Sequence, residues 1–170
     1  MATNMYLKIT GPNVDGESKD LDHEKWIEVL SYQHGVSQPT SATASTSGGR
    51  TTERCHHQDL VITKYMDAST PILNKHCCQG THLTTIELKC YRATTDGDKP
   101  VEYMAYKLEN SIISSVTVGG GPGDIPVETV TFNYGKITWV YKPQAEVAPG
   151  GVENGTNIPA SWDLVTNQAA

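Results

Sequence analysis

The stretch VETVTFNYGKITWVYK, residues 127–142, carries the clearest strand signal in the chain. Alternate positions are apolar, first Val130, Phe132 and Tyr134, then Ile137, Trp139 and Tyr141. Side chains at alternate positions of a strand share one face, so this pattern predicts two half-buried strands, Val127–Tyr134 and Lys136–Lys142. Only Gly135 separates them, which predicts a tight hairpin or a bulge at that residue.

The same pattern recurs along most of the chain. Further predicted strands are Asn4–Thr10, Trp26–Gln33, Asp59–Tyr65, Thr85–Tyr91, Glu102–Glu109 and Ser111–Val118. About eight strands in one small domain predict a mainly β fold, with two antiparallel sheets closing into a small barrel or sandwich. One short α-helix, residues 71–79, is expected on its side, because Pro71 suits a first helical position and Gly80 a left-handed stop.

The strand signals define one domain, residues 1–143, and leave two segments outside the core pattern. Residues 34–54 are expected to form a long exposed loop, because Gln38–Arg50 is built almost wholly of Ser, Thr, Ala and Gly. Residues 144–170 are expected to form a loosely held tail that Trp162 anchors again.

Composition limits the partners. The chain has 170 residues, with 19 acidic against 13 basic side chains and a net charge of −6. It contains no Lys/Arg run, so neither nucleic acid nor an anionic membrane is an expected partner. No apolar run reaches the roughly 20 residues of a spanning helix, so membrane insertion is not expected. The opening MATNMYLKITG alternates instead of forming an apolar block, so no secretory signal is predicted.

A cluster of metal-ligating residue types lies between Cys55 and Cys90. Its members are Cys55, His56, His57, His76, Cys77, Cys78, His82 and Cys90. Zinc ligands typically come as two pairs, each separated by two to four residues, and the adjacent residues Cys55, His56 and His57 offer no such pair. We therefore expect thiols, no metal and no cofactor. Two alternatives stay open: a site where His57, His76 and His82 meet, and a nucleophile at Cys77 or Cys78.

No motif of catalysis stands out elsewhere. Gly119-Gly-Gly-Pro-Gly-Asp124 is not followed by the Lys-Ser/Thr of a phosphate loop. The carboxylates Glu102, Glu109 and Glu128 show no spacing that pairs them. The sequence therefore predicts that the protein is not an enzyme.

Several blocks of sequence together resemble the Hcp family, the tube proteins of bacterial type VI secretion systems. These blocks are MYLKI, GESKD, IEVLSYQHGVSQP, HQDLVITKYMDASTPIL, YMAYKLENSIISSVTVGG, PVETVTFNYGKITWVYKPQ and SWDLVTN, in the family's order from Met5 to about Asn167. The helix departs from the family at His76 and Cys78, and the Ser/Thr-rich loop has its own composition.

The resemblance implies a homohexameric ring, stacked into a tube that a contractile sheath drives out behind a spike protein. Small effector proteins would travel in the lumen. Assembly would occur in the cytoplasm, before export to the medium or a target cell without a signal peptide. A monomeric β-sandwich module that binds carbohydrate or peptide is the alternative.

Two sets of candidate site residues follow from the resemblance to the Hcp family. Alternation in Trp26–Gln33 places Ser31 and Gln33 on one face, and the corresponding part of Hcp proteins lines the lumen. The long loop is expected to make ring contacts through Gln38, Pro39, Ser47, Gly48 and Arg50.

Overall fold

The computed structural model describes residues 3–40, 53–93, 99–146, 152–154 and 156–170. In this part of the chain, antiparallel strands and one short helix confirm the mainly β prediction. The strands are β1 Thr3–Thr10, β2 Ile27–Glu28, β3 Ser31–Gln33, β4 Val36–Ser37, β5 His56–His57, β6 Leu60–Tyr65, β7 Leu83–Arg92, β8 Val101–Gly119, β9 Val127–Tyr141, β10 Gln144–Glu146, β11 Val152–Asn154, β12 Ile158–Asp163 and β13 Gln168–Ala169, and the helix is α1 Thr70–Gln79.

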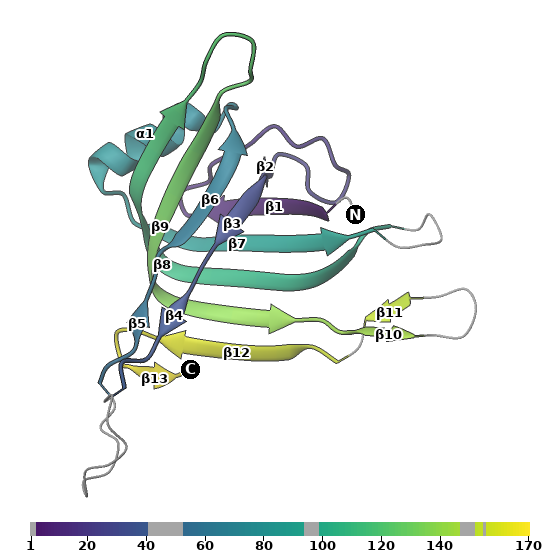
Figure 1. Cartoon of the computed structure of the whole chain (residues 1–170), viewed down its shortest axis with the longest axis vertical. Coiled ribbons are helices and arrows are strands. Elements are labelled where there is room, and N and C mark those ends of the chain that lie inside the picture. Colours follow the sequence, from purple (N-terminus) through teal and green to yellow (C-terminus); the bar gives the residue numbers. More distant parts are fainter. Residues whose placement is uncertain (1–2, 41–52, 94–98, 147–151, 155) are drawn as a thin grey trace, which may run out of the picture.

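Two long strands, β8 and β9, bend midway and join two layers (Figure 1). Their halves at 101–109 and 136–141 form a lower layer with β1, β7 and β12. Their halves at 111–119 and 127–134 form an upper layer with β6 and β3. One bent sheet therefore supplies both layers.

The expected break at Gly135 is wrong, and so is the expected break in β8 at Asn110. Both strands continue through these residues, and the register of Glu109 with Lys136 continues to Ser111 with Tyr134. Asn110 has a φ of 53°, and a Cβ at Gly135 would lie 3.2 Å from its side-chain nitrogen. A missing side chain at Gly135 thus lets the pair of strands bend as a unit.

The predicted strand Trp26–Gln33 is also wrong as a single element. The Val29 N–H donates to the Met5 carbonyl, and the next N–H, of Leu30, donates to the Thr63 carbonyl. The chain thus passes from β1 to β6 between β2 and β3. Within the described ladder, β2 and β3 do not pair with one another, and closure into a barrel stays a prediction.

The core lies between the layers, where the alternation predicted it. Fully buried side chains include Ile62, Leu88, Val130, Phe132 and Ile137. The helix begins and ends close to the predicted residues, and Gly80 adopts the expected left-handed conformation with a φ of 59°. The sequence predicted no strand after Lys142, yet β12 pairs with β9 over six residues.

Candidate assembly and cargo surfaces

Hydroxyl and amide side chains cover the outer face of the upper layer. The register aligns Ser31, Thr63, Thr129 and Thr117 in one row across β3, β6, β9 and β8. A second row consists of Gln33, Val61, Thr131 and Ser115. We call these eight positions the hydroxyl face. All are exposed or half-buried, and none is charged.

Sequence analysis found two members of this face, Ser31 and Gln33, and the structure exposes both. It missed the other six, because a row across four strands requires the register. Alternate Thr residues in VETVTFN were the available signal, since they share the outward side of β9. Ser31 Oγ also forms a hydrogen bond with Thr63 Oγ1 across the first row.

Directly behind the hydroxyl face, the same strands bury a charged cluster. Lys64 Nζ lies 2.5 Å from Glu128 Oε1 and 2.6 Å from Asp67 Oδ1. Lys64 and Glu128 are fully buried. Asp67 Oδ1 also accepts hydrogen bonds from the Ser69 N–H and hydroxyl at the start of α1. The cluster therefore ties β6 and β9 to the helix.

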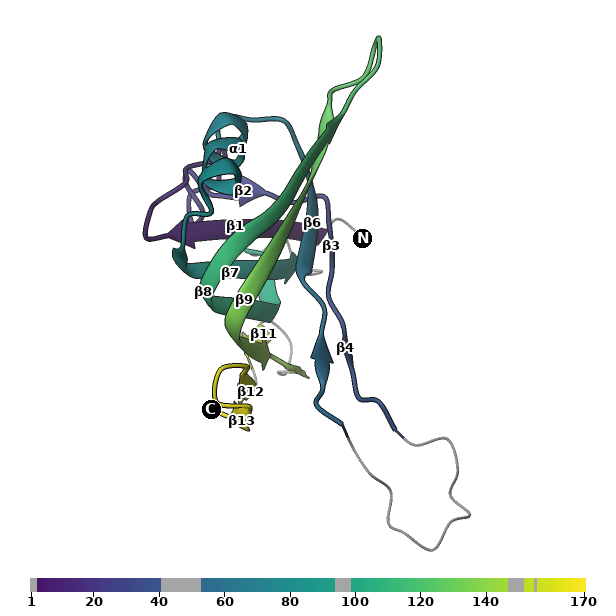
Figure 2. The same cartoon turned by 90° about the vertical axis from the view of Figure 1, so that its left-hand side faces the viewer.

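A hairpin projects from one end of the molecule (Figure 2). We call it the arm; its described residues are 34–40 and 53–59. Within it β4 pairs with β5, and the Gln38 side chain donates to the Glu53 carbonyl. Arg54 donates to the Leu164 carbonyl, which ties the arm to the C-terminal segment.

Two of the five loop residues that were predicted to make ring contacts lie in the described part of the arm. Gln38 is exposed and Pro39 is half-buried. Ser47, Gly48 and Arg50 lie outside the described residues.

At the opposite end of the molecule the hairpin between β8 and β9 projects (Figure 1), and it exposes Val118, Ile125 and Val127.

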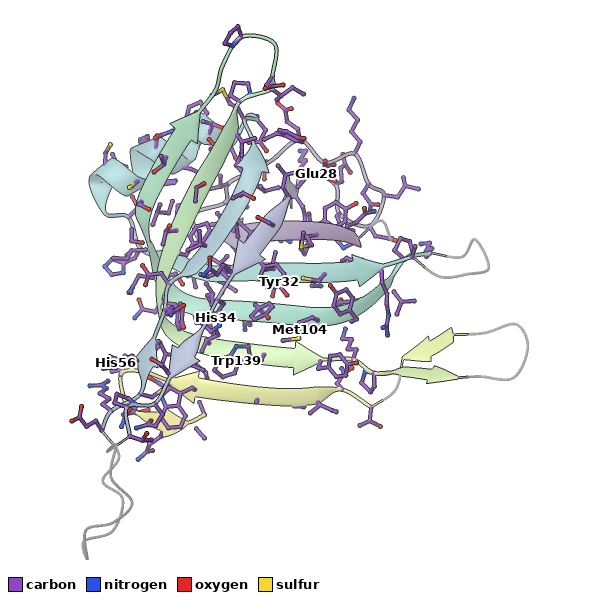
Figure 3. The ribbon with its side chains drawn as sticks, viewed as in Figure 1. Glu28, Tyr32, His34, His56, Met104 and Trp139 are labelled. Atoms are coloured by element: carbon purple, nitrogen blue, oxygen red, sulfur yellow. The ribbon has the colours of Figure 1, made fainter. Side chains whose placement is uncertain are left out.

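At the root of the arm, His34 and His57 contact Tyr134 on β9. Figure 3 shows His34 near Trp139, and their ring centroids are 6.0 Å apart. Burial lowers the pKa of both imidazoles, and the nearby His57 further lowers that of His34. No local sequence pattern predicts this contact, because Tyr134 is 77 residues beyond His57.

The Cys/His residues have separate environments. His57 Nδ1 is 3.2 Å from Tyr134 Oη, whereas His76 Nδ1 is 3.1 Å from Thr81 Oγ1. All four cysteines are free thiols. Burial raises the pKa of Cys90 to about 11, so this thiol stays protonated at neutral pH. The described residues contain no group of three or more His, Cys, Asp or Glu arranged to hold a metal ion.

A surface groove of about 550 Å³ lies between β1 and the segment 65–67. Its apolar side chains Leu30, Tyr65 and Met66 are each more than 40% exposed. Three carboxylates line it: Glu17 accepts a bond from the Ala68 N–H and Asp67 belongs to the buried cluster, which leaves Glu28 alone. The groove thus has no acid pair free for catalysis.

A family model described as "Type VI secretion system effector, Hcp" matches residues 6–141 of the chain. "Protein hcp1" of Pseudomonas aeruginosa is 36% identical over 171 residues, and the alignment covers 100% of this chain and 100% of its own. The "Major exported protein" of the same organism is 28% identical and covers 84% of this chain and 91% of its own.

Solved structures agree with these relatives. One described as a type six secretion system protein has a TM-score of 0.86 and 35% identity, covering 99% of this chain and 100% of its own. Hcp1 from Salmonella typhimurium has a TM-score of 0.76 and 29% identity over the whole of both chains.

The antiparallel β fold with its one side helix is similar to that of solved type VI secretion system proteins, and the matching family model assigns the chain to the structural proteins of this system. The chain belongs to the Hcp family. Hcp proteins are structural components of this machinery, not enzymes. No helix within the described residues is both long and apolar enough to cross a membrane.

Proposed function

We propose that six copies of this chain form a ring and that rings stack into the inner tube of a type VI secretion system. A contractile sheath drives the tube outward with a spike protein at its tip. Assembly takes place in the cytoplasm, and contraction exports the subunits without a signal peptide. Family membership supports this assignment. A cyclic ring is plausible because each subunit then has a neighbour on both flanks.

The hydroxyl face is the proposed lumen wall, and it is the observation that carries the cargo function. Hydroxyl and amide groups both donate and accept hydrogen bonds, so one surface can hold different small effectors. An uncharged wall neither repels nor retains a passenger through long-range charge. Ser31 and Gln33 lie at the β3 end of this face.

The arm is proposed as the contact between stacked rings. It projects at one end of the molecule, and the exposed apolar tip of the β8–β9 hairpin projects at the other (Figure 1, Figure 2). Elements at opposite ends favour head-to-tail stacking, in which the loop residues Gln38, Pro39, Ser47, Gly48 and Arg50 reach the next ring.

The lumen assignment is tested with Gln33→Arg. Each ring would gain six cationic side chains on the wall, so retention of an effector should fall by about tenfold or more through crowding and desolvation. Native mass spectrometry and negative-stain imaging should still show hexamers. Gln79→Arg, on the last turn of α1, is the matched control and should leave both assembly and cargo unchanged.

Two outcomes would reject these assignments. A stable 18.5 kDa monomer at tens of micromolar would reject the ring and favour the monomeric binding module. Intact rings with unchanged cargo retention in Gln33→Arg would reject the lumen wall.

Stacking is tested separately by replacing residues 41–50 with a short Gly-Ser linker. Single rings should persist, whereas sedimentation and imaging should show tube formation reduced by about tenfold or more, because the inter-ring contact is lost. Tubes of normal length and yield would contradict a stacking role for the loop.

A further inference from the structure

The Tyr134 hydroxyl lies at the root of the arm and has three polar partners. It donates to the Gln58 carbonyl at 3.1 Å. His34 Nε2 lies 2.7 Å away and His57 Nδ1 lies 3.2 Å away. Gln58 and His57 belong to one strand of the arm, and His34 begins the other. One side chain on β9 therefore holds both strands of the arm.

The donor and acceptor of each hydrogen bond in this contact follow from the number of hydrogens and lone pairs on the Tyr134 hydroxyl. A tyrosine hydroxyl has one hydrogen and two lone pairs. Because the hydrogen goes to Gln58, both lone pairs accept, and each imidazole must present an N–H to Tyr134. A neutral His34 with its proton on Nε2 and a neutral His57 with its proton on Nδ1 meet this requirement. Both nitrogens contact one oxygen, so the two imidazoles lie close together.

The surroundings of the pair are aromatic. Tyr106 and Trp139 lie beside His34, and Trp139 and Trp162 lie beside His57. Hydrogen bonds and ion pairs of the described residues place no carboxylate on either ring. A positive charge on these rings would therefore have no carboxylate partner in these contacts.

The surrounding elements carry further titratable groups. They are Tyr106 on β8, Tyr134 on β9, Asp163 on β12, and Arg54, Cys55, His56 and Asp59 on the arm. The register places three more charged residues, Lys107, Glu109 and Lys136, on the other side of the lower layer. Asp59 accepts hydrogen bonds from Ser114 and Asn133, and Asp163 accepts backbone N–H bonds from Val165 and Thr166. Neither carboxylate is directed to the imidazole pair by these contacts.

Burial lowers the pKa of His34 and His57 below the ordinary value of 6.5, and His57 lowers that of His34 further. A histidine with a lowered folded pKa favours the folded contact fully above its ordinary pKa. That contribution is lost as the pH falls through the lowered value. Mildly acidic solution therefore works against the contact, and neutral solution favours it.

We propose that His34, His57 and Tyr134 form a pH-sensitive latch that holds the arm against the body when both imidazoles are neutral and releases it when both are protonated. Two adjacent cations with no carboxylate partner repel each other, and water must enter to solvate them. Arg54, bound to the Leu164 carbonyl, keeps the root of the arm tethered.

The consequence for assembly rests on the proposed role of the arm in stacking. A released arm would present its loop to the next ring in many orientations, so acid would weaken contacts between rings and leave the flanks of each ring intact. The partner affected is a second copy of this chain in the adjoining ring.

Hydrogen exchange of the full chain, read by mass spectrometry at about pH 5 and about pH 7.5, tests the latch. After correction for intrinsic rates, peptides covering 34–40 and 53–60 should exchange on the order of tenfold faster at the lower pH. The double variant His34→Gln/His57→Gln keeps two N–H donors without a titratable ring, so its arm should respond by less than about twofold. His56→Gln is the matched control, because His56 is exposed, and it should behave as the wild type.

A wild-type arm with no pH response, or a double variant with the wild-type response, would overturn the latch. Exchange is measured within one chain, so this result stands whether or not rings stack. Sedimentation of tubes at both pH values then tests the consequence. A latch that opens without any loss of tubes would reject the stacking role of the arm and leave the latch in place.

Discussion

The two sides of the upper layer invert the usual distribution of charge. Toward the interior, β6 and β9 bury Lys64 and Glu128 completely. Toward the outside, the same strands carry the uncharged hydroxyl face. Charged side chains are normally exposed and are buried only when paired. The difference indicates two separate roles. The inner side holds β6 and β9 in one arrangement with α1, and the hydroxyl face on the outer side carries no charged side chain.

Breaking the buried cluster should have the largest effect. Lys64→Met leaves the buried Glu128 and the half-buried Asp67 without a cation, and should lower the free energy of unfolding by about 3–5 kcal/mol. Urea denaturation at fixed protein concentration measures it. The double variant Lys64→Met/Glu128→Leu removes both buried charges and should recover a large part of the loss. A single variant as stable as the wild type would show that the cluster does not stabilise the layer.

A smaller effect should separate adjacent residues of β9 that face opposite sides. Val130 is fully buried and Thr131 is half-buried on the hydroxyl face. Val130→Thr places a hydroxyl among apolar groups and should cost about 1–3 kcal/mol. Thr131→Val should change stability by less than about 0.5 kcal/mol. Equal losses in urea denaturation would mean that the outer side is as tightly packed as the inner.

Local pattern predicted much of the fold because it depends on residues close in sequence. Alternation identified the buried positions Val130, Phe132, Tyr134 and Ile137 of β9, and cap signals located α1 to within one residue. The family could also be inferred, since several blocks retain its order. Of the candidate site, alternation supplied only the β3 pair, Ser31 and Gln33.

What the sequence by itself determined is which residues can be buried on each strand and which family the chain belongs to. The continuity of β8 and β9 was decided only in the tertiary structure, because Asn110 and Gly135 bend two strands that pair across the bend. Burial of Lys64 likewise depends on carboxylates from β9 and from the turn before α1. The rows of the hydroxyl face and the contact of His34 and His57 with Tyr134 arise from strand pairing between distant segments. A linear pattern gives the face of each residue, and only the register tells which residues of other strands share it.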